Sequence, residues 1–181
     1  MKRVIISLII MFSFFNNVSA NYKQLAYDFE FNSIDGKIIK LSDYKNKVIV
    51  VVNVASRCGF TNQYADLQKL WLTYQNKGLI VLGVPTNDFK QEPDSNKAIK
   101  DFCETNFNIN FPMSEKINVV GSNSHPFFKW AKENYGNGAV PKWNFHKIII
   151  GKDGKIVDTF ASITKPNSKR FIKSIEDKIK N

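Results

Sequence analysis

The segment Lys47–Ala55 (KVIVVVNVA) constrains the fold more than any other part of the chain, because it is a nearly continuous run of β-branched residues. Such a run is typical of a strand that is buried on both faces, whereas a half-exposed strand alternates apolar and polar residues. Leu79–Pro85 is a second run of this kind. Two strands buried on both faces need helices on both sides of one sheet, so we expect an α/β domain.

Periodicity in the rest of the chain predicts the remaining elements. Apolar residues at helical spacing predict helices over Asn62–Gln75, Ser95–Phe107, Phe127–Asn134 and Ser168–Lys180. Short strands on either side of turn residues predict two hairpins, which pair Asp28–Phe31 with Lys37–Leu41 and Phe145–Ile150 with Lys155–Phe160. Because hairpins are antiparallel, the sheet of this α/β domain should be mixed.

Composition and missing motifs exclude several classes of function. The 181-residue chain has two cysteines and two histidines, too few for a disulfide scaffold or a four-cysteine zinc site. It contains neither GxGxxG nor GxxxxGK[ST], so we expect no dinucleotide or P-loop site and no bound cofactor or metal. The net charge of +10 comes without a basic–aromatic recognition motif, so we expect a lysine-rich solvated surface and no nucleic-acid partner.

The first residues have the pattern of a secretory signal peptide. Basic Met1–Arg3 precedes apolar Val4–Phe15, and Val18-Ser19-Ala20 forms a small-x-small cleavage site. The apolar run is shorter than the ~20 residues that span a bilayer, so we expect no stable membrane insertion. We therefore predict a cleaved signal peptide over 1–20, a single domain over 21–181, and export to the periplasm of a bacterial host.

Cys58 is the candidate nucleophile. It lies between the buried run Lys47–Ala55 and the helix expected from Asn62, where free backbone N–H groups and the helix dipole favour a thiolate. A dithiol CxxC loop would need a second cysteine where Thr61 stands, so disulfide exchange within this loop is excluded. A single activated thiolate suits attack on a peroxide oxygen, which gives a sulfenic acid. A buried structural cysteine is the alternative reading.

Four sequence blocks carry a resemblance to a known family. They are Asn53–Thr61 (NVASRCGFT), Val84–Pro93 (VPTNDFKQEP), Phe111-Pro112-Met113 with Lys116-Ile117, and Trp143-Asn144-Phe145. In order and spacing the chain resembles cysteine-containing bacterial members of the glutathione peroxidase family, from about Tyr27 to its end. The resemblance implies a thioredoxin-like fold with a mixed central sheet and an N-terminal β-hairpin. It also implies a thiol peroxidase that reduces hydrogen peroxide or organic hydroperoxides, regenerated by a thioredoxin-like reductant or glutathione.

The family's catalytic tetrad maps onto four residues of this chain. Cys58 matches the peroxidatic position, and Gln91, Trp143 and Asn144 match the residues that surround it. The types suit the chemistry, because neutral amide and indole N–H groups can stabilise a thiolate and the charge that develops on a leaving oxygen.

Two departures from the family pattern bear on the reductant and on assembly. Many thiol-dependent relatives have a resolving cysteine in the helix that follows the second block, and Cys103 lies one position before that place. Cys103 can therefore be a resolving cysteine or a small packed side chain. Tetrameric relatives insert a long segment before the Trp-Asn pair, where this chain has only Asn134–Lys142, so we expect a monomer.

Two other functions remain open at this stage. One is an exported thiol-oxidation sensor or oxidant relay that uses Cys58 and Cys103 to oxidise a partner protein. The other is a binding protein with an inactive site, against which the intact tetrad argues. The two histidines carry structural interpretations: His125 before Pro126 is typical of a helix cap, and His146 lies within an expected strand.

Overall fold

A four-stranded mixed sheet organises the molecule. The computed structural model describes residues 22–180, and the expected signal peptide over 1–20 lies outside them. The strand order is β4 (Leu79–Pro85), β3 (Val48–Val54), β5 (Lys147–Ile150) and β6 (Ile156–Phe160). β3 pairs parallel with β4 and antiparallel with β5, and β5 pairs antiparallel with β6. The predicted mixed sheet and the second hairpin are confirmed.

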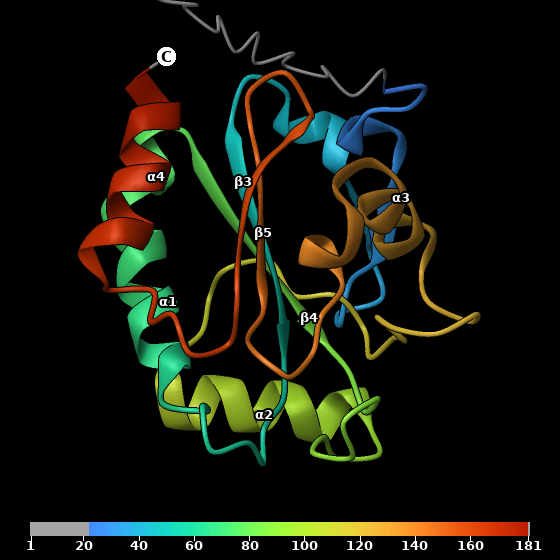
Figure 1. Cartoon of the computed structure of the whole chain (residues 1–181). Helices are drawn as coiled ribbons and strands as arrows, with labels where there is room; N and C mark the ends of the chain where they lie inside the picture. The colour runs from blue at the N-terminus through green and yellow to red at the C-terminus, as the bar shows by residue number, and fades with distance from the viewer. Residues whose placement is uncertain (1–21, 181) are drawn as a thin grey trace, which may run out of the picture.

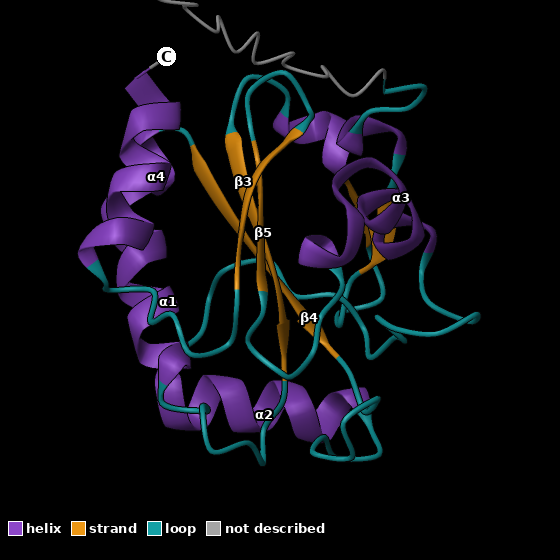
Figure 2. Ribbon diagram, viewed as in Figure 1, coloured by secondary structure: helices purple, strands orange, loops and turns teal. Residues whose placement is uncertain are grey.

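Alternate residues of β3 point into two separate apolar clusters. Val50 packs with residues of α1 (Gln63–Tyr74), α2 (Asn96–Phe107) and α4 (Lys169–Lys180), whereas Val51 packs with residues of α3 (Pro126–Tyr135). Figure 1 shows α1 and α4 together on one side of the sheet, α3 on the other, and α2 across one end. Figure 2 shows that loops connect the strands to the helices at that end. Burial on both faces explains why β3 lacks polar alternation.

β4 is buried, as its sequence predicts, but it is an edge strand and not a central one. The segment over 111–114 covers its free edge: the Gly83 N–H donates to the Pro112 carbonyl at 2.9 Å, and the Ser114 N–H donates to the Gly83 carbonyl at 2.9 Å. A Cβ atom at Gly83 would lie 3.0 Å from the Phe111 ring, so glycine permits this close approach. Backbone pairing with a loop thus replaces the missing strand.

The N-terminal hairpin is a separate two-stranded sheet of β1 (Glu30–Asn32) and β2 (Ile38–Lys40). It lies on the α3 side, where the Phe31 ring packs against His125 and Phe127. The described part of the chain also contains four 3-10 helices, at Ala26–Asp28, Leu41–Tyr44, Gln75–Lys77 and Gly136–Ala139. Among residues 22–180, no helix combines the length and the apolar character that crossing a bilayer requires.

Candidate active site

Cys58 lies in a tight series of turns between β3 and α1. The side chain is 7% exposed, and its Sγ accepts the backbone N–H of Phe60 at 3.4 Å. The Thr61 hydroxyl accepts the Cys58 N–H at 3.1 Å and donates to the Cys58 carbonyl, which fixes the turn. The donor to Sγ therefore belongs to the turn, and α1 itself begins only at Gln63. A backbone N–H aimed at sulfur stabilises the thiolate form of a cysteine.

Gln91 joins the Cys58 loop to Asn144. Its carbonyl accepts the Arg57 N–H at 2.9 Å, and its side-chain Oε1 accepts the Asn144 amide at 2.9 Å. The Asn144 side chain is fully buried, so this bond orients both amides. Because Gln91 uses its oxygen as the acceptor, its Nε2–H groups remain available as donors. Three segments far apart in the sequence meet here, as the resemblance implies.

Trp143 forms the outer wall of the same region. Its side chain is 40% exposed, and the indole ring packs against Phe89 with the ring centroids 5.4 Å apart. Phe89 precedes the Gln91 segment, so this contact and the Asn144–Gln91 bond both tie the loop before β5 to the loop after β4. A half-exposed aromatic ring beside the buried Asn144 amide and the partly buried Gln91 amide gives the region one apolar wall that is open to solvent.

Asn53, at the end of β3, positions the Trp-Asn pair, a role that the sequence did not reveal. Its amide donates to the Trp143 carbonyl at 3.1 Å, its Oδ1 accepts the His146 N–H at 3.0 Å, and its backbone carbonyl accepts the Phe145 N–H. These bonds hold Phe145 at a φ of 64°, a left-handed conformation that is costly for a bulky residue. Strain of this kind persists where the surroundings fix it and commonly marks functional sites.

Lys90 adopts a similar conformation, with a φ of 58°, directly before Gln91. The Lys90 N–H donates to the Asn87 carbonyl at 2.9 Å, and Asn87 Oδ1 accepts the Glu92 N–H at 3.1 Å. Asn87 therefore holds this loop through both its side chain and its backbone carbonyl. Gln91 therefore follows a residue in the left-handed region, and Asn144 precedes one.

Cys103 occupies a different setting, in the middle of α2. Its side chain is 1% exposed, it is a free thiol like Cys58, and both cysteines belong to the same apolar cluster with Tyr64. Burial raises the pKa of the Cys103 thiol to about 12, so it is protonated at neutral pH. A buried, protonated thiol suits a packed side chain, and a resolving cysteine would first have to become exposed.

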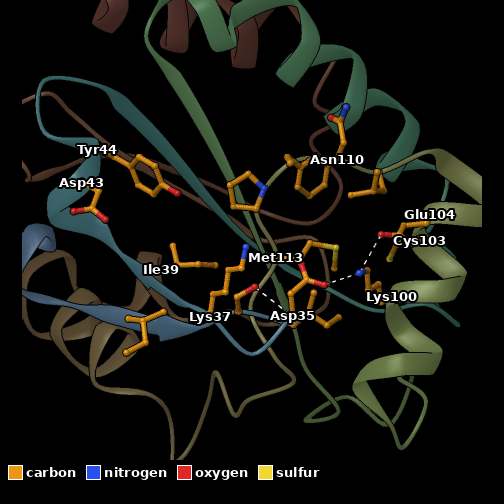
Figure 3. A pocket seen from close by; sticks show the side chains of 16 residues that line it. Asp35, Lys37, Ile39, Asp43, Tyr44, Lys100, Cys103, Glu104, Asn110 and Met113 are labelled. Atoms are coloured by element: carbon orange, nitrogen blue, oxygen red, sulfur yellow. Dashed lines mark hydrogen bonds and ion pairs between the residues drawn. The ribbon is translucent and has the colours of Figure 1, made fainter.

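A cavity of about 430 Å³ lies between the N-terminal hairpin and α2, and Cys103 lines part of its wall. Figure 3 shows Lys100 of α2 reaching both Asp35 of the hairpin and Glu104 of its own helix. The Lys100–Asp35 ion pair measures 2.5 Å, with both side chains partly exposed. On this face a cavity leaves the packing of α2 incomplete. The surface ion pair that remains contributes little to the stability of the helix.

The two histidines have structural roles. His125 caps α3 by accepting the Phe127 N–H at its Nδ1, as its position before Pro126 predicts. His146 is buried, and burial lowers its pKa to about 4, so it is neutral. Within residues 22–180 there is no group of three or more potential metal ligands.

The fold and these contacts define a thioredoxin-fold protein with one cysteine in the loop after the first central strand. At the level of fold alone, the chain is similar to a thiol:disulfide interchange protein of the thioredoxin family from Chlorobium tepidum, with a TM-score of 0.65 at 15% identity over 83% of this chain and 92% of that chain. Two solved structures are more similar in sequence, described as Trgpx in apo form and T. cruzi GPX1. Their TM-scores are 0.70 and 0.67, at 35% and 31% identity, covering 88% and 87% of this chain and 97% and 98% of theirs.

Sequence comparisons specify the family. The family described as glutathione peroxidase matches residues 26–132. The chain is 40% identical over 159 residues to a hydroperoxy fatty acid reductase of Synechocystis, covering 83% of this chain and 94% of that protein. It is 43% identical over 147 residues to a glutathione peroxidase-like peroxiredoxin of Saccharomyces cerevisiae, covering 78% and 90%. The chain belongs to the glutathione peroxidase family and is a thiol peroxidase, an oxidoreductase that reduces hydroperoxides.

Proposed function

We propose that Cys58 is the peroxidatic thiol and that Gln91, Trp143 and Asn144 are the donors that serve it. The observation that carries this assignment is the double attachment of Gln91, which is bonded through its carbonyl to Arg57, next to Cys58, and through its side chain to Asn144. The arrangement supports a site in which neutral N–H donors surround a thiolate without quenching its nucleophilicity.

In the first half of the cycle, the Cys58 thiolate attacks one oxygen of the hydroperoxide. The S–O bond forms as the O–O bond breaks, which leaves Cys58 sulfenic acid and an alkoxide or hydroxide that takes up a proton to give alcohol or water. Donors placed on the leaving oxygen stabilise the charge that develops there. The Gln91 Nε2–H groups, left free by the bond to Asn144, are the first candidates for this task.

In the second half, a thiol removes the sulfenic acid. We propose that Cys103 attacks the Cys58 sulfur, forming a Cys58–Cys103 disulfide and releasing water, and that a thioredoxin-like protein then reduces the disulfide. Because Cys103 lies within α2, this step requires local opening of that helix to bring the two sulfurs within bonding range. The loosely held hairpin face of α2 supports such an opening.

A Cys103→Ala variant separates the two roles of this cysteine. One equivalent of peroxide should give a Cys58–Cys103 disulfide in the unmodified chain, detected by mass spectrometry under non-reducing conditions. The variant should lose most of its thioredoxin-dependent turnover. Full turnover in the variant would show that Cys103 only packs, and that the reductant attacks the Cys58 sulfenic acid directly.

Organic hydroperoxides are the substrate class that the site suits, together with hydrogen peroxide. The half-exposed Trp143 ring against Phe89 offers an apolar wall to a hydrocarbon chain, and one relative is named a hydroperoxy fatty acid reductase. Glutathione is the alternative reductant, but Arg57 is the sole arginine close to Cys58 in the sequence. Coupled assays with thioredoxin and thioredoxin reductase, and with glutathione and glutathione reductase, run in parallel, distinguish the two reductants.

We also propose that the protein is exported to the periplasm after cleavage behind Ala20 and acts as a monomer. The sequence pattern of residues 1–20 supports export, and the short connection over 134–142 supports the monomer. N-terminal sequencing of protein from the native host should give Asn21, and light scattering should give the mass of one chain. A protein that retains Met1 would contradict the export proposal.

A thiol-oxidation sensor or oxidant relay is the second candidate function. The presence of two free cysteines in one apolar cluster favours it, because an internal disulfide could be passed to a partner protein. Trapping of a mixed disulfide with a partner, without multiple turnovers of peroxide, would support the relay. Rapid multiple turnover with thioredoxin would support the peroxidase.

A further inference from the structure

Glu92 is the one buried carboxylate beside the Cys58 loop, among the residues that the structure describes. Its Oε2 accepts the backbone N–H of Ser56, and its own N–H donates to Asn87 Oδ1 at 3.1 Å. The preceding residue, Gln91, accepts the Arg57 N–H through its carbonyl. Two consecutive residues of one loop therefore hold two consecutive residues of the loop that leads into Cys58.

We propose that Glu92 is a positioning residue whose ionised carboxylate fixes the Cys58 loop through Ser56, and whose protonation loosens that loop. The inference deepens the proposed function, because it rests on Cys58 as the peroxidatic thiol. Glu92 is assigned no contact with the peroxide; it acts through the backbone that carries Cys58 and through its neighbour Gln91.

The Glu92 carboxylate accepts the Ser56 N–H but forms no ion pair with any of the described residues. The carboxylate is 4% exposed, its Oε1 is buried without a hydrogen-bond partner, and no salt bridge to it occurs within residues 22–180. A carboxylate in this position is costly compared with a neutral side chain that could make the same bond. Because a neutral acceptor could bind the Ser56 N–H at a lower desolvation cost, we infer that the ionisable carboxyl group of Glu92 has a further role.

The charged and titratable groups around Glu92 come from four elements. Arg57 in the Cys58 loop and Lys116, just after the segment over 111–114 that covers β4, both favour the ionised form of Glu92. The Lys116 Nζ is itself hydrogen-bonded to the carbonyls of Pro93 and Asp94. Tyr64 of α1 and Cys103 of α2 are the interior titratable groups near Glu92: burial raises the pKa of each, and the charge of Glu92 raises both further.

Burial outweighs the hydrogen bonds from Ser56 and the two cations, and it raises the pKa of Glu92 to about 7. The carboxyl group is therefore close to half ionised at neutral pH. An ionised acceptor makes a shorter and stronger bond to a backbone N–H than a neutral one does. The bond to Ser56 should tighten as pH rises through 7 and weaken as pH falls, and the order of the Cys58 loop should change in the same direction.

Nuclear magnetic resonance of the full chain tests this coupling directly. The variant Cys58→Ser provides the background, since it removes the reactive thiol from the loop. The amide proton of Ser56 should shift downfield as pH rises, with a midpoint near 7, and the carboxyl carbon of Glu92 should titrate with the same midpoint. A Ser56 signal without a transition between pH 5.5 and 8.5 would overturn the proposal, whatever the activity of the enzyme.

Two further variants in the same background complete the test. Glu92→Gln keeps an acceptor for Ser56 but cannot ionise, so it should abolish the Ser56 transition. Glu133→Gln makes the same change at an exposed position of α3 and should leave the transition in place. Persistence of the transition in Glu92→Gln would contradict the assignment to Glu92. If Glu92→Gln does not fold, the titration of the Glu92 carboxyl carbon still decides the question.

The rate of Cys58 oxidation tests whether the ionisation of Glu92 affects the reactivity of the Cys58 thiol. With Cys58 present, the rate of its oxidation by one equivalent of hydrogen peroxide should depend less on pH between 6 and 8 in Glu92→Gln than in the unmodified chain. Identical pH profiles for the two proteins would contradict control of the loop by Glu92. Loss of all oxidation at Cys58 in the unmodified chain would instead contradict the proposed function.

Discussion

Cys58 and Cys103 are both buried in the same apolar cluster, yet the backbone setting and the hydrogen-bond donors of the two thiols differ. Cys58 lies in turns, with a backbone N–H on its sulfur and with the bonded pair Gln91–Asn144 attached to its loop. Cys103 lies in mid-helix, and burial raises its pKa to about 12. The comparison teaches that burial alone makes a cysteine inert, and that burial beside N–H donors supports a reactive one.

The largest effect should come from exchanging sulfur for oxygen at each cysteine in turn. Cys58→Ser should abolish peroxide reduction, because a serine hydroxyl is not ionised at neutral pH. Cys103→Ser makes the same change in the same cluster and should still consume one equivalent of peroxide. Single-turnover peroxide consumption measures the activity of both variants. If Cys58→Ser consumed as much peroxide as the unmodified chain, the two cysteines would not differ in reactivity as we propose.

The next effect concerns the side-chain donors that we propose for Cys58. Gln91→Ala should lower the rate of peroxide reduction by about 10–1000-fold, the range expected for loss of one donor to a developing oxyanion. Trp143→Phe, which removes the indole N–H but keeps an aromatic ring, should also lower it. Gln75→Ala, at the opposite end of α1, is the control and should have no effect. A rate unchanged in Gln91→Ala would mean that Gln91 holds the loop and does not act on the peroxide.

A smaller effect should follow from loosening the segment that carries Trp143 and Asn144. Asn53→Ala removes a partly buried bond to the Trp143 carbonyl and a buried bond from the His146 N–H. We expect a loss of about 1–3 kcal/mol in the free energy of unfolding, because buried groups lose their partners. Guanidinium unfolding measures it, with exposed Asn76→Ala as the control. Unchanged stability would indicate that the segment is held by packing alone.

A pH-dependent effect concerns the other end of the Cys58 loop, where Lys147 is fully buried and its Nζ donates to Gln63 Oε1 at 2.5 Å and to the Thr164 carbonyl at 2.6 Å. Burial lowers the pKa of Lys147 from 10.5 to about 7. The folded state therefore binds fewer protons than the unfolded state between about pH 7 and 10.5, so its stability should rise with pH in that window. Lys147→Met should reduce this rise, measured by guanidinium unfolding at several pH values. An equal rise in the variant would assign it to another group.

The strands were predictable because their composition records burial on both faces. Val48–Val54 and Leu79–Pro85 lie within or on the predicted ranges, and each of the four predicted helices is present. The edge position of β4 was not predictable, because the pairing of Gly83 with the segment over 111–114 depends on tertiary contacts. A strand that a loop covers has the same composition as one that another strand covers.

The sequence could indicate candidate site residues where chemistry depends on a residue type at a position in a motif, as for Cys58 and Gln91, and their catalytic roles stay predictions. The residues that position the site were missed, because their partners lie far away in the sequence. Asn53 bonds to residues 143–146, and Lys147 bonds to Gln63 and Thr164. Lys147 gave one weak signal, a charged residue at the start of the apolar run over 147–150.

Trapping of the sulfenic acid tests the central claim most directly, that Cys58 and not Cys103 reacts with the peroxide. The Cys103→Ala variant, which cannot form the internal disulfide, is treated with one equivalent of hydrogen peroxide in the presence of dimedone, a reagent that labels sulfenic acids. Mass spectrometry of the digest should show one dimedone adduct, on the peptide that contains Cys58. Consumption of the peroxide without a label on that peptide would contradict the account.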